Sequence, residues 1–97
     1  MLNDPMGSLK LRFLERCREE LAALESIARR PIDIHEDGHE RLIKIAHALA
    51  GAGGTFGFKS ISEHSSRLEE ALLAGAEPAE IRSSLDALIL ELRRVAG

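Results

Sequence analysis

Apolar residues recur every three or four positions in four stretches of the chain, and proline or glycine residues stand between the stretches. This spacing places the apolar side chains of each stretch on one face of a helix. Because the connections between the stretches are short, each helix is expected to run antiparallel to the next. The pattern therefore predicts an all-α fold, an antiparallel up-and-down four-helix bundle. The predicted helices cover approximately residues 8–30, 34–52, 60–74 and 78–95.

The second predicted helix has two candidate start signals and one stop signal. Asp33 and Asp37 are each followed three residues later by a glutamate, which is the spacing of a capping box, and the sequence does not choose between them. The glycine-rich run at 51–54 is typical of a helix end, because glycine readily adopts the left-handed conformation found there. We therefore expect this helix to end near Ala52.

The third and fourth predicted helices carry clearer boundary signals. Ser60 and Glu63 have the spacing of a capping box, so Ser60 is predicted to cap the third helix. Gly75 is predicted to end that helix. Pro78 suits the first position of a helix, where its missing N–H would have no partner, so the fourth helix is expected to start there.

One buried face is predicted for each helix, and the four faces together are enough for one core. We therefore expect a single domain over residues 1–97, with residues 1–7 outside the helices and flexible. The residues on the predicted buried faces are Leu14, Cys17, Leu21, Leu24, Ala28, Leu42, Ile45, Ala46, Leu49, Gly53, Ile61, Ser65, Leu68, Leu72, Ile81, Leu85, Leu88, Leu92 and Val95.

Charge and cysteine content exclude several classes of protein. The chain carries a net charge of −3, whereas a general nucleic-acid binder normally presents a basic face. Cys17 is the only cysteine, which excludes a disulfide framework within the chain and a cysteine-rich zinc site. The apolar runs fall far short of the roughly 20 residues that cross a bilayer. We expect a soluble, cytoplasmic protein that binds neither nucleic acid nor membrane.

His47 is the candidate functional residue of the second helix. At about 100° per residue it lies roughly 140° from Leu42, outside the buried stripe. Several of its neighbours on the helix surface have little or no side chain, which leaves the imidazole on a low, flat patch. Glycine inside a helix costs about 1 kcal/mol relative to alanine, and close approach by another protein would explain that cost. The neighbours are Ile43, Lys44, Ala50, Gly51 and Gly54.

Glu69 is the predicted partner of His47. It lies on the flank of the third helix, about 80° from Ile61 on the helical wheel. If the second and third helices are adjacent, its carboxylate can accept a hydrogen bond from the Nδ1–H of His47. Nε2 would then hold the lone pair and act as the nucleophile, with Glu69 orienting the ring.

Residues 46–58 resemble the core motif of histidine-containing phosphotransfer (HPt) domains. In that family a hydrophobic residue follows the phospho-accepting histidine by two positions, and glycines follow it by four and by ten. The matching residues here are His47, Leu49, Gly51 and Gly57. The resemblance extends over approximately residues 40–73 and includes Glu69, where the family commonly carries the acidic residue that hydrogen-bonds the histidine. The motif is most similar to that of the phosphotransfer domain of the chemotaxis histidine kinase CheA.

The resemblance implies a protein that carries a phosphoryl group on His47 in a two-component phosphorelay. The group would be exchanged with an aspartate of response-regulator receiver domains, and a histidine kinase, hybrid kinases included, would be a further partner. The receiver would supply Mg²⁺. The chain itself would bind no cofactor and would have no ATP site, because its glycines follow a helix instead of a strand and lack the partners of a Gly-rich phosphate loop. We expect a monomeric carrier and not an enzyme. The predicted docking residues are Ile43, Ala50, Gly51, Gly54 and Phe58.

Position 50 departs from the family pattern. Ala50 stands where the family usually has a lysine that neutralises phosphoryl charge. Lys44, one turn before His47 on roughly the same face, is the candidate substitute. The chemotaxis kinase also has an additional histidine near its site, where this chain has Ser66. The departure leaves an alternative function open, a non-phosphorylated helical interaction module that docks on a receiver or kinase.

Three other features of the sequence bear on function. His35 and His39 have the four-residue spacing of a zinc-binding pair, but they stand at an uncertain helix start, so no metal site is predicted. Cys17 lies in the apolar stripe of the first helix and is predicted to pack in the core. Phe56 and Phe58 are predicted to plug the end of the bundle, and an exposed Phe58 would also be free to contact a partner.

Overall fold

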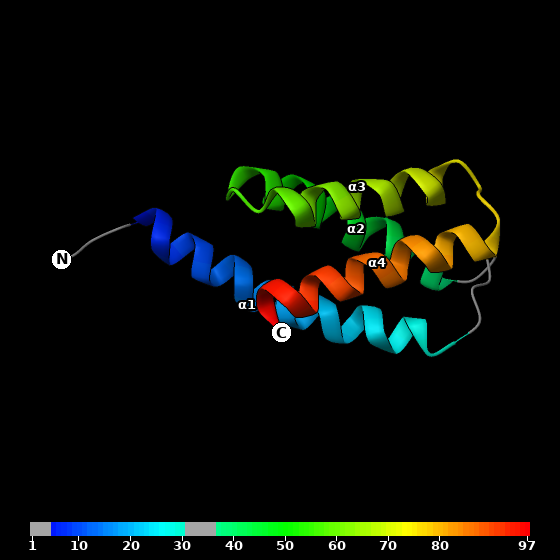
Figure 1. The fold of residues 1–97 in the computed structure, drawn as a ribbon, viewed down its shortest axis with the longest axis horizontal. Helices are drawn as coiled ribbons and strands as arrows, with labels where there is room; N and C mark the ends of the chain where they lie inside the picture. The colour runs from blue at the N-terminus through cyan, green and yellow to red at the C-terminus, as the bar shows by residue number, and fades with distance from the viewer. Residues whose placement is uncertain (1–4, 31–36) are drawn as a thin grey trace.

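The structure is a computed structural model that describes residues 5–30 and 37–97. Successive helices run in opposite directions along one long axis, and each helix packs against the two beside it (Figure 1). No strand is present in the described residues. The predicted all-α fold, an antiparallel up-and-down four-helix bundle, is therefore confirmed. The helices are α1 (Pro5–Ala28), α2 (Asp37–Thr55), α3 (Lys59–Leu73) and α4 (Pro78–Ala96).

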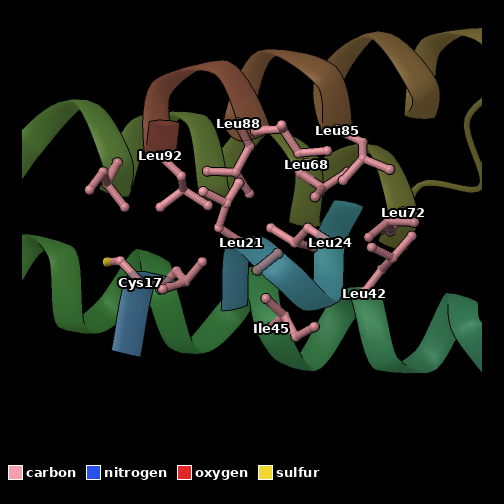
Figure 2. Close-up of a cluster of buried hydrophobic side chains, with 14 of the residues drawn as sticks. Cys17, Leu21, Leu24, Leu42, Ile45, Leu68, Leu72, Leu85, Leu88 and Leu92 are labelled. Carbon is pink, nitrogen blue, oxygen red and sulfur yellow. The ribbon is translucent and has the colours of Figure 1, made fainter. Parts of the chain in front are cut away.

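Leucine and isoleucine side chains from all four helices meet between the helices and form the core (Figure 2). Most of the predicted core residues are buried, Cys17 and Ser65 included, whereas Leu14, Ala28 and Val95 are half-buried. Burying one leucine or isoleucine side chain stabilises a fold by about 1.5–3 kcal/mol, so these faces dominate the stability of the bundle. The buried apolar residues are Phe13, Cys17, Leu21, Leu24, Leu42, Ile45, Ala46, Leu49, Ile61, Leu68, Ala71, Leu72, Ile81, Leu85, Leu88, Ile89, Leu92 and Ala96.

α1 both begins and ends earlier than predicted. Its first residue is Pro5, so residues 5–7 belong to the helix and the expectation that they lie outside it is wrong. Proline is favourable at a first helical position because its missing N–H would have no partner there. The helix ends at Ala28, and Arg29 and Arg30 follow it in a turn. The first turns of α1 extend past the other three helices (Figure 1).

α2 continues through the glycine-rich run that was expected to end it. It ends at Thr55, so the predicted end near Ala52 is wrong. Packing outweighs the low helix propensity of glycine, because Gly53 lies against the backbone at the start of α3, where a side chain would crowd it. The left-handed turn after the helix is made instead by Gly57, whose φ is +83°.

The other boundaries of α2, α3 and α4 lie close to the predicted ones. Asp37 is the first helical residue of α2 instead of the residue before the helix, and Asp33 lies outside the described residues. Gly75 follows α3 with a φ of +66°, which confirms it as the residue that prevents the helix from continuing. Pro78 is the first residue of α4, as predicted.

The predicted capping box at the start of α3 is wrong. The residue before the helix is Phe58, and no side chain caps the first turn. Ser60 instead donates its hydroxyl hydrogen to the carboxylate of Glu91 on α4. The Arg94 guanidinium and the Ser60 hydroxyl both hydrogen-bond this carboxylate and lower the pKa of Glu91 to about 2. A tertiary contact has therefore taken the side chain that local spacing assigned to the cap.

Candidate functional site

α2 and α3 approach each other closely beside His47. A Cβ atom on Gly53 would lie 3.1 Å from the backbone nitrogen of Ser62 and 3.3 Å from the carbonyl oxygen of Phe58. The Ser62 hydroxyl donates a hydrogen bond of 2.7 Å to the carbonyl oxygen of Ala50. These contacts fix α3 alongside the C-terminal half of α2, which is the half that carries His47.

His47 and Glu69 face each other across the two helices. Nδ1 of His47 lies 2.6 Å from Oε2 of Glu69. An ionised carboxylate can only accept a hydrogen bond, so in the neutral imidazole Nδ1 carries the proton and Nε2 holds the lone pair. The side chain of His47 is 77% exposed and that of Glu69 is 20% exposed. The structure thus brings together the two residues that the helical wheel pairs, and it presents Nε2 on an oriented, accessible ring.

The surface of α2 around His47 is low. Gly51 and Gly54 are exposed, and a Cβ atom on Gly51 would meet no atom within 4 Å. Ala50 and Ile43 are half-buried. Positions 50, 51 and 54 therefore carry at most a methyl group, which leaves room for a second protein to approach the ring.

Lys44 is the cation nearest to His47 along α2. Its side chain is exposed, and residues three apart on a helix are surface neighbours. An ammonium group on a flexible four-carbon stem can reach an anion on the neighbouring ring. The geometry therefore leaves Lys44 available to an anionic group at Nε2, while Ala50 provides none of the charge that a lysine there would bring.

Three phenylalanine rings close one end of the bundle. The ring centroid of Phe13 lies 5.7 Å from that of Phe56 and 5.2 Å from that of Phe58. Phe56 and Phe58 are half-buried, as expected of residues that plug the bundle end. The apolar stripe of the first helix did not single out Phe13, whose burial comes from this aromatic cluster. A docking role for Phe58 stays a prediction, since its ring packs on Phe13.

The remaining candidate residues lie outside this site. His39 is half-buried near the start of α2, and its spacing partner His35 lies outside the described residues. Burial raises the pKa of the Cys17 thiol to about 11, so a neutral thiol packs in the core. Within residues 5–30 and 37–97, no group of three His, Cys, Asp or Glu side chains is arranged to hold a metal ion. No helix in the described part of the chain is long and apolar enough to cross a membrane.

Two residues close to the site were not singled out from the sequence. Ser62 ties α3 to the carbonyl of Ala50. Leu73 is exposed and lies one helical turn after Glu69. The four-residue spacing between Leu73 and Glu69 was a usable signal, because residues four apart share a helix face. Ser62 offered no such signal, since its contact depends on how two helices pack.

Comparison with known proteins adds an independent finding. Residues 8–97, which are all but the first seven residues, match the family described as Hpt domain. The matched range contains α2, α3 and α4 in full and most of α1. Searches of curated proteins and of solved structures found no match.

Proposed function

The chain belongs to the Hpt domain family, the histidine phosphotransfer domains of phosphorelays, and we propose that His47 is the residue that carries the phosphoryl group. The observation that carries the proposal is the 2.6 Å contact between Nδ1 of His47 and the Glu69 carboxylate. This contact leaves the Nε2 lone pair on a side chain that is 77% exposed. The other histidines in the described residues, His39 and His64, are half-buried.

In the proposed reaction, the Nε2 lone pair of His47 attacks the phosphorus atom of an aspartyl phosphate on a receiver domain. The N–P bond forms while the bond between phosphorus and the aspartate oxygen breaks, and the electron pair of that bond returns to the aspartate carboxylate. The proton on Nδ1 stays in place, so the phosphorylated ring is positively charged. The reverse transfer uses the same geometry.

Glu69 supports both states of the ring. Before transfer, its carboxylate holds the tautomer in which Nε2 is the nucleophile. After transfer, its negative charge lies next to the positively charged ring, and the hydrogen bond becomes charge-assisted at both ends. One residue thus orients the acceptor and stabilises the product.

Most of the phosphoryl charge is met by the partner in this proposal. Ala50 supplies no cation, and Lys44, exposed one turn before His47 on α2, is the cation proposed to meet the group. The receiver would supply Mg²⁺ and cationic groups to stabilise the transferring phosphoryl oxygens. The chain acts as a carrier that holds neither metal nor ATP.

The motif and the composition support four further proposals. Residues 46–58 are most similar to the phosphotransfer domain of the chemotaxis kinase CheA, and a histidine kinase is a second partner. The protein is a monomer and is located in the cytoplasm. The lone Cys17, a buried neutral thiol, is consistent with a reducing compartment.

Transfer from phosphorylated receiver domains tests the proposal. Receivers of the source organism, charged with acetyl phosphate, are mixed with the wild-type chain, with His47→Gln and with the matched control His64→Gln. We expect an acid-labile, alkali-stable label on the wild type and on His64→Gln, and none on His47→Gln. A label that persists on His47→Gln would contradict the site assignment.

A second candidate function is an interaction module that docks on a receiver or kinase without accepting phosphate. The observation that favours it is Ala50, which provides no charge where the family usually has lysine. The same assay separates the two functions. If the chain is only an interaction module, we expect the wild-type chain to bind a receiver but to be labelled by none of the receivers tested.

A further inference from the structure

Among the described residues of α2 and α3, Leu73 is the large apolar residue most exposed to solvent, with a relative exposure of 66%. The other large apolar side chains of high exposure in the described residues lie on α1 and α4, and they are Met6, Leu9, Leu11 and Leu90. A single exposed leucine is ordinary on a protein surface. Its meaning therefore depends on where Leu73 lies relative to His47.

Two hydrogen bonds define the register of α3 on α2. Near the start of α3, Ser62 bonds the carbonyl of Ala50, and one Cβ on Gly54 would lie 3.5 Å from the Ser62 hydroxyl. Farther along α3, Glu69 bonds His47. Moving forward along α3 thus corresponds to moving back along α2.

Leu73 follows Glu69 by one turn of α3, and Ile43 precedes His47 by about one turn of α2, so both residues lie on the same side of the His47–Glu69 pair. Ile43 is half-buried and packs against the core. Leu73 is therefore the open part of an apolar edge at one end of the His47 site. Ala50, Gly51 and Gly54 form the opposite, low end.

We infer that Leu73 is an apolar anchor for the receiver domain that exchanges the phosphoryl group with His47, an inference that rests on the proposed function. A receiver that brings its aspartate to Nε2 must cover the ring and its surroundings. A stable interface buries about 800 Å² on each partner, which reaches well beyond one helical turn from its centre. The Cβ atoms of residues one turn apart lie about 5–6 Å from each other, so Leu73 falls inside such an interface with Glu69.

The two ends of the site contribute differently to docking. The low end at Gly51 and Gly54 permits close approach but offers little side-chain area. Leu73 offers apolar area that is still in water and is gained on binding. Because Leu73 and Ile43 carry no charge, the receiver that fits this edge presents an apolar side chain opposite Leu73.

The test compares Leu73→Ala with the matched control Leu90→Ala. The two leucines are exposed to the same degree, 66% and 68%, and Leu90 lies on α4, outside the α2–α3 pair. Alanine is a strong helix former, so both variants should keep the fold, which circular dichroism and thermal melting check. For a receiver that labels the wild type, we expect Leu73→Ala to raise Kd by about tenfold, and Leu90→Ala to leave it unchanged. The transfer rate at saturating receiver should be the same for all three chains.

Measuring Kd at several salt concentrations, together with the labelling assay, distinguishes failure of this inference from failure of the proposed function. Screening acts on charges and not on an apolar contact, so the ratio of the Kd of Leu73→Ala to that of the wild type should stay constant as salt rises. Suppose that a receiver labels the wild-type chain and binds Leu73→Ala with the same Kd as the wild-type chain. That result would overturn this inference and leave the proposed function standing. If no receiver labels the wild type, the proposed function falls and the inference falls with it.

Discussion

Different contacts join the helix pair α2–α3 and the helix pair α1–α4. α2 and α3 meet through small residues, because Gly53 lies against the α3 backbone and Ser62 bonds a carbonyl of α2. α1 and α4 meet through long arginine side chains, and each helix sends one arginine to the C-terminal end of the other. These are Arg82 of α4 and Arg18 of α1.

The arginine contacts satisfy backbone carbonyls that a helix end leaves without partners. Arg82 donates hydrogen bonds of 2.6 Å to the carbonyl oxygens of Ala28 and Arg30 at the end of α1. Arg18 donates one of 2.8 Å to the carbonyl oxygen of Ala96 at the end of α4. A cation at a helix C-terminus also interacts favourably with the helix dipole. The antiparallel arrangement makes this exchange reciprocal.

The difference explains why the candidate site lies on α2 and α3. The α1–α4 side carries an open groove whose charged lining residues are already paired in part, as in the 2.6 Å contact between Arg93 and Glu25. On the α2–α3 side, close packing needs no long side chains at the contact. The ring of His47 can therefore stand on a low surface, held by one carboxylate.

The largest effect is expected at the charged contact between α2 and α3. Glu69→Ala removes the partner of Nδ1, so the ring loses its fixed tautomer and the phosphorylated ring loses its counter-charge. A hydrogen bond to a charged group contributes about 1.5–3 kcal/mol, which predicts a loss of about 10- to 100-fold in the single-turnover transfer rate. Glu70→Ala, at the exposed neighbouring position, is the matched control and should transfer at the wild-type rate. Equal rates for the two variants would contradict the role of Glu69.

The next effect concerns the close approach of the helices. Gly53→Val places a branched side chain against the α3 backbone, and overpacking of this kind costs about 1–3 kcal/mol of unfolding free energy. Gly51→Ala meets no atom, so it should stabilise the protein by about 0.5–1 kcal/mol through helix propensity. Urea denaturation measures both. A Gly53→Val protein as stable as the wild type would show that α2 and α3 need not pack this closely.

The smallest effect tests the α1–α4 pair. Arg82→Met keeps most of the side-chain length but removes both bonds to carbonyls at the end of α1, with an expected cost of about 1–2 kcal/mol. Arg93→Met breaks the exposed ion pair with Glu25 and should cost less than about 1 kcal/mol. Both variants should accept phosphate from a receiver as the wild type does. If Arg82→Met transferred phosphate more slowly than its lower stability explains, the α1–α4 pair would contribute to transfer, which would contradict the assignment of function to the α2–α3 side alone.

The contact at the centre of the site was predictable because it depends on local periodicity. Two helical wheels place His47 outside one buried stripe and Glu69 on the flank of another, and antiparallel neighbours then bring the two together. The end of α2, the bond from Ser60 to Glu91 and the burial of Phe13 were not predictable in this way. Each depends on a residue of another helix, and spacing within one helix carries no information about that partner.

The sequence by itself determined the number of helices, their apolar faces, their antiparallel order and the position of His47 away from the core. These follow from a repeat that each stretch carries independently. Only the tertiary structure decided that the glycine-rich run stays helical, that Ser60 leaves its cap, and that Leu73 stays exposed to solvent. The physical reason is that propensities and caps are worth about 1 kcal/mol each, while the contacts between packed helices are worth more and select the final ends and register.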